Sequence, residues 1–128
     1  MRLLLDTHAF LWAIAEPDKL SRRARTAISD SRNDIVLSTV SLWEITLKVE
    51  AGKLRLPASQ GYFEGHMEQL GVKELLDVTP RHVYALLVLP PLHKDPFDRL
   101  LVAQAMSEDL TLLTADAVIR GYPLKTAW

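Results

Sequence analysis

The sequence predicts an α/β fold with a mostly parallel central sheet flanked by helices. Short apolar runs of strand length alternate along the chain with segments whose apolar residues recur at helical spacing. Strands that alternate with helices in this way form parallel sheets covered by those helices. The chain has 128 residues, enough to bury its own core, and contains no internal repeat, low-complexity tract or linker. We therefore expect a single domain over residues 1–128.

The first half of the chain is expected to hold two strands and three helices. Pro17 ends the first helical segment, Ser21 is a candidate N-cap for the arginine-rich second one, and the third ends near Gly52. Each strand is an apolar run that ends in polar residues, as a buried strand does. In chain order the expected elements are strand 2–7, helix 8–17, helix 20–32, strand 34–39 and helix 41–54.

The second half is expected to hold three helices and three strands. Thr79 followed by Pro80 is a helix start, because threonine is a good N-cap and proline is favoured at the first helical position. Pro96 is placed in the same way at the start of a later helix. The glycines at 61 and 65 weaken the helix in which they lie. In chain order the expected elements are helix 59–71, strand 72–78, helix 79–90, helix 95–109, strand 110–116 and an edge strand at 122–128.

The composition is that of a globular protein and excludes several classes of protein and site. Hydrophobic residues make up 48% and charged residues 24%. No apolar run approaches the roughly 20 residues that cross a bilayer, and the N-terminus has no secretory signal pattern. The lack of cysteine excludes disulfides and thiolate metal sites and fits a cytoplasmic protein. A net charge of −1, from 15 basic and 16 acidic residues, neither predicts nor forbids binding of nucleic acid.

Four acidic residues, here called the four rim acids, are expected at one edge of the sheet. Asp6 ends the first strand, and Asp116 lies just past the strand "TLLT". Glu44 and Asp98 are expected in the first turns of the helices over 41–54 and 95–109. In an open parallel sheet, ligands bind outside the carboxyl ends of the strands. Because the following helices start at the same edge, all four side chains are expected to share it.

Each acid also has an ordinary structural explanation. Residues 41–44 (SLWE) match a capping box, in which Glu44 would only satisfy a backbone N–H group. Asp95 is a candidate N-cap, and Asp98 would be favoured in a first turn by the helix dipole. The other two acids could be loop residues that face water. Taken together, however, the four form a pattern that capping alone does not explain.

A cluster of four carboxylates predicts a divalent cation. Two carboxylates about 5 Å apart repel by roughly 3 kcal/mol at an effective dielectric constant near 20. A lone charge after the buried run "LLL" is costly unless it is paired. Oxygen ligands without sulfur favour Mg²⁺ or Mn²⁺. Such a site suggests phosphoryl chemistry in which a metal-activated water attacks, and no serine or cysteine stands in a nucleophile motif.

Four motifs in order resemble the PIN domain, and more closely the VapC ribonuclease toxins of bacterial type II toxin–antitoxin modules: "LLLDTHAFLW", "STVSLWEITLK", "LHKDPFDRLLVAQA" and "LLTAD". The resemblance implies a three-layer α/β/α fold and Mg²⁺- or Mn²⁺-dependent endonucleolytic cleavage of RNA. It implies partners as well: a second copy in a homodimer, and a VapB-type antitoxin whose C-terminal segment blocks the site. No membrane is implied.

The resemblance also assigns residues. It carries the family's acidic site over to Asp6, Glu44, Asp98 and Asp116. Asp95 is either a further metal ligand or only the cap of its helix, and we favour the cap.

Several neighbours of these acids are candidates for supporting roles. Thr7 and Thr114 are hydroxyls beside ligands that could orient them. Among the basic residues, Lys48, Lys94 and Arg99 are candidates for contact with RNA phosphates. Arg99 is equally well explained by pairing with a nearby acid.

Two other residues near the acids are assigned structural places. His93 is expected to be a loop residue and not a general base, because a metal-activated water needs none. Trp43 is expected in the core, with stacking on RNA bases open only to aromatic residues that prove exposed.

Two rival functions remain open from the sequence. A metal-dependent phosphotransfer domain of the haloacid-dehalogenase or receiver type also places aspartates at strand ends. Such a phosphatase needs a second aspartate two residues after its nucleophile, and His8 stands there instead. A non-catalytic PIN relative that binds RNA or a protein partner would be expected to have lost an acid, and this chain keeps all four.

Overall fold

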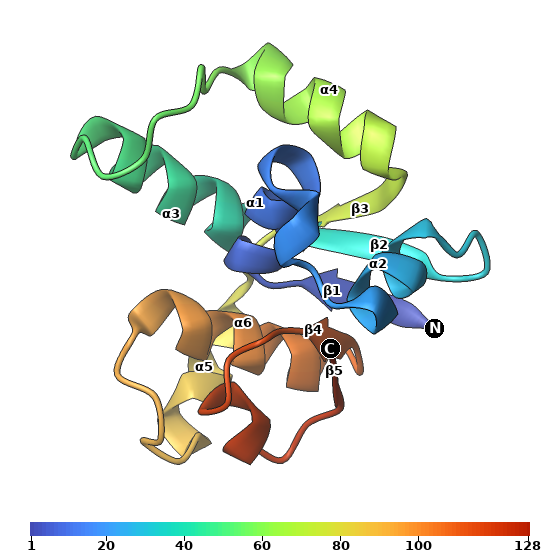
Figure 1. Cartoon of the computed structure of the whole chain (residues 1–128). Coiled ribbons are helices and arrows are strands. Elements are labelled where there is room, and N and C mark those ends of the chain that lie inside the picture. Colours follow the sequence, from blue (N-terminus) through green and yellow to red (C-terminus); the bar gives the residue numbers. More distant parts are fainter.

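In the computed structural model, which describes residues 1–128, a five-stranded sheet runs through the middle of the molecule (Figure 1). All strand pairs are parallel, and the strand order is β3-β2-β1-β4-β5. The predicted α/β class is confirmed, including the last short edge strand. The strands are β1 (Arg2–Leu5), β2 (Asp34–Ser38), β3 (Val72–Leu76), β4 (Thr111–Leu113) and β5 (Thr126–Ala127).

Helices cover both faces of this sheet (Figure 1). Those that follow β1 and β2 pack on one face, and those between β3 and β4 pack on the other. No helix has both the length and the apolar character needed to span a bilayer. The α-helices are α1 (Thr7–Ala15), α2 (Arg22–Ser29), α3 (Thr39–Glu50), α4 (Gln60–Leu70), α5 (Pro80–Ala85) and α6 (Pro96–Ser107). Short 3₁₀ turns are η1 (Pro17–Lys19), η2 (Leu86–Val88) and η3 (Ile119–Gly121).

The strands read as continuous apolar runs because both faces of the sheet are buried. Leu3 and Leu5 belong to the core beneath α1, α3 and α4, whereas Leu4 belongs to the core beneath α6. All three side chains are fully buried. The alternation of side chains along a strand divides one apolar run between two cores.

The start of α3 corrects one prediction. The helix begins at Thr39 and is capped by Ser38, whose Oγ accepts a hydrogen bond from the N–H group of Val40 at 3.0 Å. The predicted start at residue 41 and the capping box over 41–44 are therefore wrong, and Glu44 lies in the second turn. The hydroxyl of Ser38 also donates a 2.5 Å hydrogen bond to Oε1 of the buried Gln104 in α6, which ties the start of α3 to that helix.

The sheet topology places the functional edge of the molecule. From β1 the chain proceeds outward to β2 and β3, then returns across the sheet to β4 and β5 on the other side of β1. The connections therefore leave β1 and β4 in opposite directions. Such a switch point opens a crevice at the carboxyl ends of the strands, where ligands bind in open α/β sheets.

Candidate active site

Asp6 is held at the carboxyl end of β1 by backbone hydrogen bonds. Its N–H group donates to the carbonyl oxygen of Leu113 at 3.1 Å, and its Oδ1 accepts from the N–H group of Ala9 at 2.7 Å as the cap of α1. The side chain is buried, and burial raises the pKa of Asp6, while hydrogen bonds from Thr114 and Ala9 partly oppose this. The capping bond uses one oxygen and leaves Oδ2 for other contacts.

Asp116 lies in the loop after β4, on the other side of the switch point. Its Oδ1 accepts hydrogen bonds from the N–H groups of Val118 and Ile119, at 2.8 and 3.4 Å. Its own N–H group donates to Oγ1 of Thr114 at 3.0 Å. Burial alone would raise the pKa of Asp116, but the hydrogen bonds from His93 and Val118 outweigh it and lower the pKa. Thr114 thus contacts both Asp6 and Asp116, the place expected of a hydroxyl that orients the site.

Asp98 is a second acid of the site whose charged form is disfavoured. It lies in the first turn of α6, which Asp95 caps by accepting from the N–H groups of Phe97 and Asp98. The capping role expected for Asp95 is confirmed. Burial, and then the negative charge of Asp95, raise the pKa of Asp98 to about 7, and the charges of Glu44 and Asp6 add to the effect. The neutral form of Asp98 is therefore favoured up to much higher pH than for an exposed aspartate.

Glu44 points inward from α3 and has one of its oxygens engaged. Its side chain is 4% exposed, and Oε2 forms an ion pair of 2.9 Å with Lys48 one turn later. Oε1 is buried and accepts no hydrogen bond. One turn before it, the hydroxyl of Ser41 accepts from Thr7 Oγ1 at 3.0 Å, which joins the start of α1 to α3. Thr7, a candidate for a supporting role, therefore links the start of α1, which Asp6 caps, to the helix that carries Glu44.

The structure brings the four rim acids into one electrostatic neighbourhood. The charges of Glu44 and Asp6 act on Asp98, and the charge of Asp116 acts on Asp6. These acids come from a strand end, two helices and a loop that are remote in sequence. Their common place follows from the parallel sheet, since strand ends and helix starts meet at one edge.

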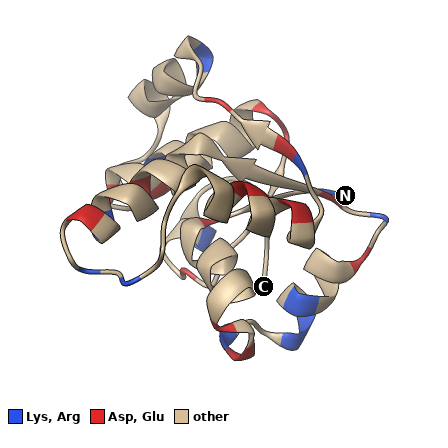
Figure 2. Cartoon of the chain, turned by 90° about the horizontal axis from the view of Figure 1, so that it is seen from above, with Lys and Arg blue, Asp and Glu red and all other residues tan.

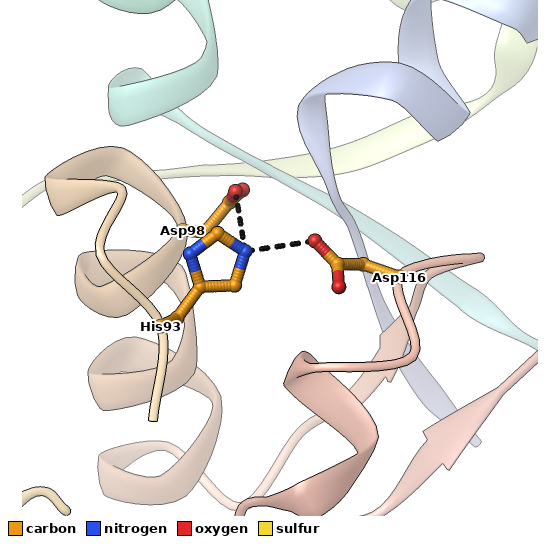
Figure 3. A group of neighbouring side chains, drawn as sticks. All are labelled: His93, Asp98 and Asp116. Atoms are coloured by element: carbon orange, nitrogen blue, oxygen red, sulfur yellow. Dashed lines mark hydrogen bonds and ion pairs between the residues drawn. The ribbon is translucent and has the colours of Figure 1, made fainter. Parts of the chain in front are cut away.

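His93 joins two of the acids, a role that sequence reasoning missed. Its Nε2 lies 2.8 Å from Oδ2 of Asp116 and 3.3 Å from Oδ2 of Asp98 (Figure 3). His93 does lie in the loop before α6, as expected, but its ring contacts with the two acids were not predicted. A histidine two residues before the cap of the helix that carries a site acid was the available signal, and it is weak without the fold.

A model of the PIN domain matches residues 3–123 of the chain. The chain belongs to the PIN domain family. Ribonuclease VapC22 of Mycobacterium tuberculosis is 28% identical to this PIN domain over 122 residues, which are 94% of this chain and 91% of that protein. The resemblance to VapC-type PIN proteins is thereby confirmed.

Solved structures share the fold of this PIN domain. One is VapBC2 from Rickettsia felis bound to a DNA fragment from their promoter, with a TM-score of 0.71 at 17% identity, over 99% of this chain and 98% of that chain. Another is FitAcB from Neisseria gonorrhoeae, with a TM-score of 0.60 at 17% identity, over 97% and 95%. At such identities the likeness concerns the fold alone.

The side chains of the PIN domain's acidic edge fit a hard divalent cation. The four rim acids offer only oxygen ligands, and hard cations such as Mg²⁺ and Mn²⁺ prefer oxygen. The unpartnered Oε1 of Glu44 is a buried acceptor, and such an atom is costly unless something donates or coordinates to it. Burial raises the pKa values of Asp6 and Asp98, and a nearby cation would favour their charged forms.

The three basic residues that are candidates for contact with RNA phosphates differ in how far they are already bonded within the protein. Lys94 is exposed, and Lys48 is engaged by Glu44. Arg99 donates to the carbonyl oxygen of Leu86 at 3.4 Å and pairs with no acid, so the alternative of pairing with an acid is wrong. Acidic and basic residues are both spread over the molecule (Figure 2).

An aromatic side chain borders the acids at the surface. Trp43 is 56% exposed, so its predicted place in the core is wrong. Its ring packs edge-on against Phe97 with centroids 4.9 Å apart. A hollow of about 390 Å³ is lined by Glu44, Phe97 and two lysines, Lys48 and Lys53. Two consecutive residues of α3 thus point in different directions: the carboxylate of Glu44 faces inward and the indole of Trp43 faces solvent.

Proposed function

We propose that this PIN domain, a single domain over residues 1–128, is a Mg²⁺- or Mn²⁺-dependent endoribonuclease and the toxin of a type II toxin–antitoxin module. The observation that carries the proposal is the meeting of the four rim acids at the switch point of the sheet, with one of their oxygens buried and unpartnered. The relation to a ribonuclease of the VapC type supports the same activity.

The rim acids divide their oxygens between support and binding. Asp6 Oδ1 caps α1, and Glu44 Oε2 holds Lys48, so Oε1 of Glu44 has no partner and is available to a cation. Asp98 and Asp116 complete the set of ligands. When bound, a divalent cation supplies positive charge to the phosphodiester and lowers the pKa of the attacking water. The first turn of α6 adds N–H groups and the positive end of a helix dipole for a phosphate.

The surface beside the acids suits single-stranded RNA. Trp43 offers an exposed ring for stacking on a base, and Lys53 and Lys94 are exposed positive charges. Bases that are unstacked from a loop or an end are the parts of RNA that proteins read through aromatic side chains. We therefore propose that the substrate is cleaved in a single-stranded segment.

The activity is tested by mapping new RNA 5′ ends after induction in a bacterial host. The wild type is expected to create new ends at a small set of sites, and Asp6→Asn to create none. The asparagine oxygen can still accept from Ala9 N–H, so the cap of α1 is kept and the variant folds. Identical end maps for the two proteins at equal expression would contradict the proposal.

Replacement of Trp43 by alanine is expected to weaken binding of a single-stranded RNA oligonucleotide by about 5-fold to 150-fold, because stacking is worth about 1–3 kcal/mol per base. The change is measured by fluorescence anisotropy in an Asp6→Asn background, where the RNA is not cut. Trp43→Phe keeps a ring and is expected to retain most of the affinity. Equal affinity of the alanine variant would rule out stacking.

We further propose a second copy of the chain and a VapB-type antitoxin as protein partners. An apolar surface is available: Tyr84, Leu87 and Val88 on α5 and η2 are 66%, 84% and 84% exposed. Contiguous exposed apolar side chains of this kind mark interaction sites. The R. felis structure of the same fold contains VapBC2. Light scattering of the purified chain would report the homodimer directly.

A further inference from the structure

His93 is fixed in the structure by contacts at three points. Its backbone N–H group donates to Oη of the buried Tyr122 at 2.8 Å. Its ring nitrogen Nδ1 accepts from the N–H group of Asp95 at 3.0 Å. Its other ring nitrogen, Nε2, reaches Asp116 and Asp98 (Figure 3). The orientation of the ring is therefore set by the fold and not by the two acids alone.

The contact at Nδ1 defines where the proton of a neutral ring lies. Because a backbone N–H group can only donate, Nδ1 must be the unprotonated nitrogen. The hydrogen of the neutral imidazole is then on Nε2, and it is donated to the carboxylates of Asp116 and Asp98. In this tautomer Nε2 has no lone pair to offer a cation, so the ring supports the acids and does not ligate beside them.

The two acids that the ring joins are carried by different parts of the fold. Asp98 is on α6, and Asp116 is in the loop after β4, where its other oxygen is held by backbone N–H groups. The ion pairs and hydrogen bonds in the structure connect these two carboxylates only through His93. Without it, a partly buried Asp98 would face the other acids with no donor between them.

We propose that His93 is a positioning residue of the metal centre, whose Nε2–H group draws Asp98 and Asp116 together so that both can bind one cation. This inference rests on the proposed function, because it assumes that the rim acids bind a divalent metal. Partners that orient ligands in this way typically contribute 10-fold to 100-fold to metal affinity.

Two substitutions of His93 by amide residues each keep one contact of the ring and remove the other. In His93→Gln the amide nitrogen lies near the position of Nε2, so a donor to the acids is kept and the contact with Asp95 is lost. In His93→Asn the shorter amide can take the place of Nδ1 and accept from Asp95, but it cannot reach the acids. His66→Asn, on α4 against Tyr62, is the matched control away from the site.

The test is calorimetric titration of each purified protein with Mn²⁺, without RNA. We expect His93→Asn to bind Mn²⁺ about 10-fold to 100-fold more weakly than the wild type. His93→Gln and His66→Asn are expected to lose much less affinity than this lower bound of about 10-fold. Circular dichroism of the metal-free proteins confirms that all four are folded.

Several outcomes would overturn the inference. Wild-type or tighter affinity of His93→Asn would show that the ring does not assemble the site. Equal weakening of the glutamine and asparagine variants would show that the Nε2–H donor is not what matters. Nitrogen coupling from a directly bound imidazole in the Mn²⁺ spin-echo spectrum of the wild type would make His93 a ligand. If the wild type binds no Mn²⁺, the proposed metal-dependent function itself fails, a different result from wild-type binding that His93→Asn leaves unchanged.

Discussion

Asp98→Asn is expected to reduce RNA cleavage by more than about 100-fold, beyond the 10-fold to 100-fold loss typical of groups that only support a metal ligand. The substitution removes a carboxylate that faces three other acids and replaces it with an amide that binds Mg²⁺ poorly. The measurement is the single-turnover cleavage rate of an RNA that carries a mapped site. Asp18→Asn, on the exposed turn η1, makes the same chemical change away from the site and is expected to cleave normally. Full metal-dependent activity of Asp98→Asn would remove Asp98 from the site.

The same variant is expected to stabilise the metal-free protein at alkaline pH. The pKa of Asp98 is raised from its usual 3.8 to about 7, so the folded state binds a proton that the unfolded state has lost. The stability this proton confers is complete below pH 4 and is lost as the pH rises through 7. Asparagine does not titrate, so the difference in unfolding free energy between Asp98→Asn and the wild type should grow between pH 5 and pH 8. With allowance for solvent screening, we expect a gain of about 1–2 kcal/mol in the unfolding free energy by urea denaturation. A lower stability of Asp98→Asn at pH 8 would contradict the repulsion argument.

Metal affinity is expected to depend on pH through the same carboxyl group. Asp98 must lose its proton to bind a cation, and with a pKa of about 7 it is mostly protonated at pH 6 and mostly ionised at pH 8. The apparent affinity for Mn²⁺ should therefore rise by about tenfold from pH 6 to pH 8. Calorimetry in buffers with different heats of ionisation measures both the affinity and the protons released.

The proton count makes this prediction specific. More protons should be released on binding at pH 6 than at pH 8, since burial and the neighbouring acids favour the neutral form of Asp98 at the lower pH. Equal affinity at the two values, with no proton released, would mean that Asp98 is already ionised or does not bind the metal.

Much of this molecule was predictable from local patterns. Apolar runs of strand length and helical spacing gave the α/β class, and Asp95 before Pro96 gave the cap and start of α6. These signals act over a few residues, so a sequence displays them directly. The placing of the four rim acids needed one further step, the rule that parallel strands end at a common edge.

The start of α3 could not be predicted from neighbouring residues alone. Two serines three residues apart, Ser38 and Ser41, are both good caps by their own chemistry. The structure uses Ser38, whose hydroxyl also bonds to the amide oxygen of Gln104, 66 residues away, across the packing of α3 and α6. Such a contact exists only after the layers have assembled.

The sequence by itself determined the class of fold, the order of the elements, the four rim acids and the resemblance to the PIN family. The tertiary structure decided which side chains stand between those elements. It turned Trp43 outward, and it brought His93 to Asp116, 23 residues away. The physical reason is range: periodicity and capping are properties of neighbouring residues, whereas exposure and ring contacts depend on how separate elements pack.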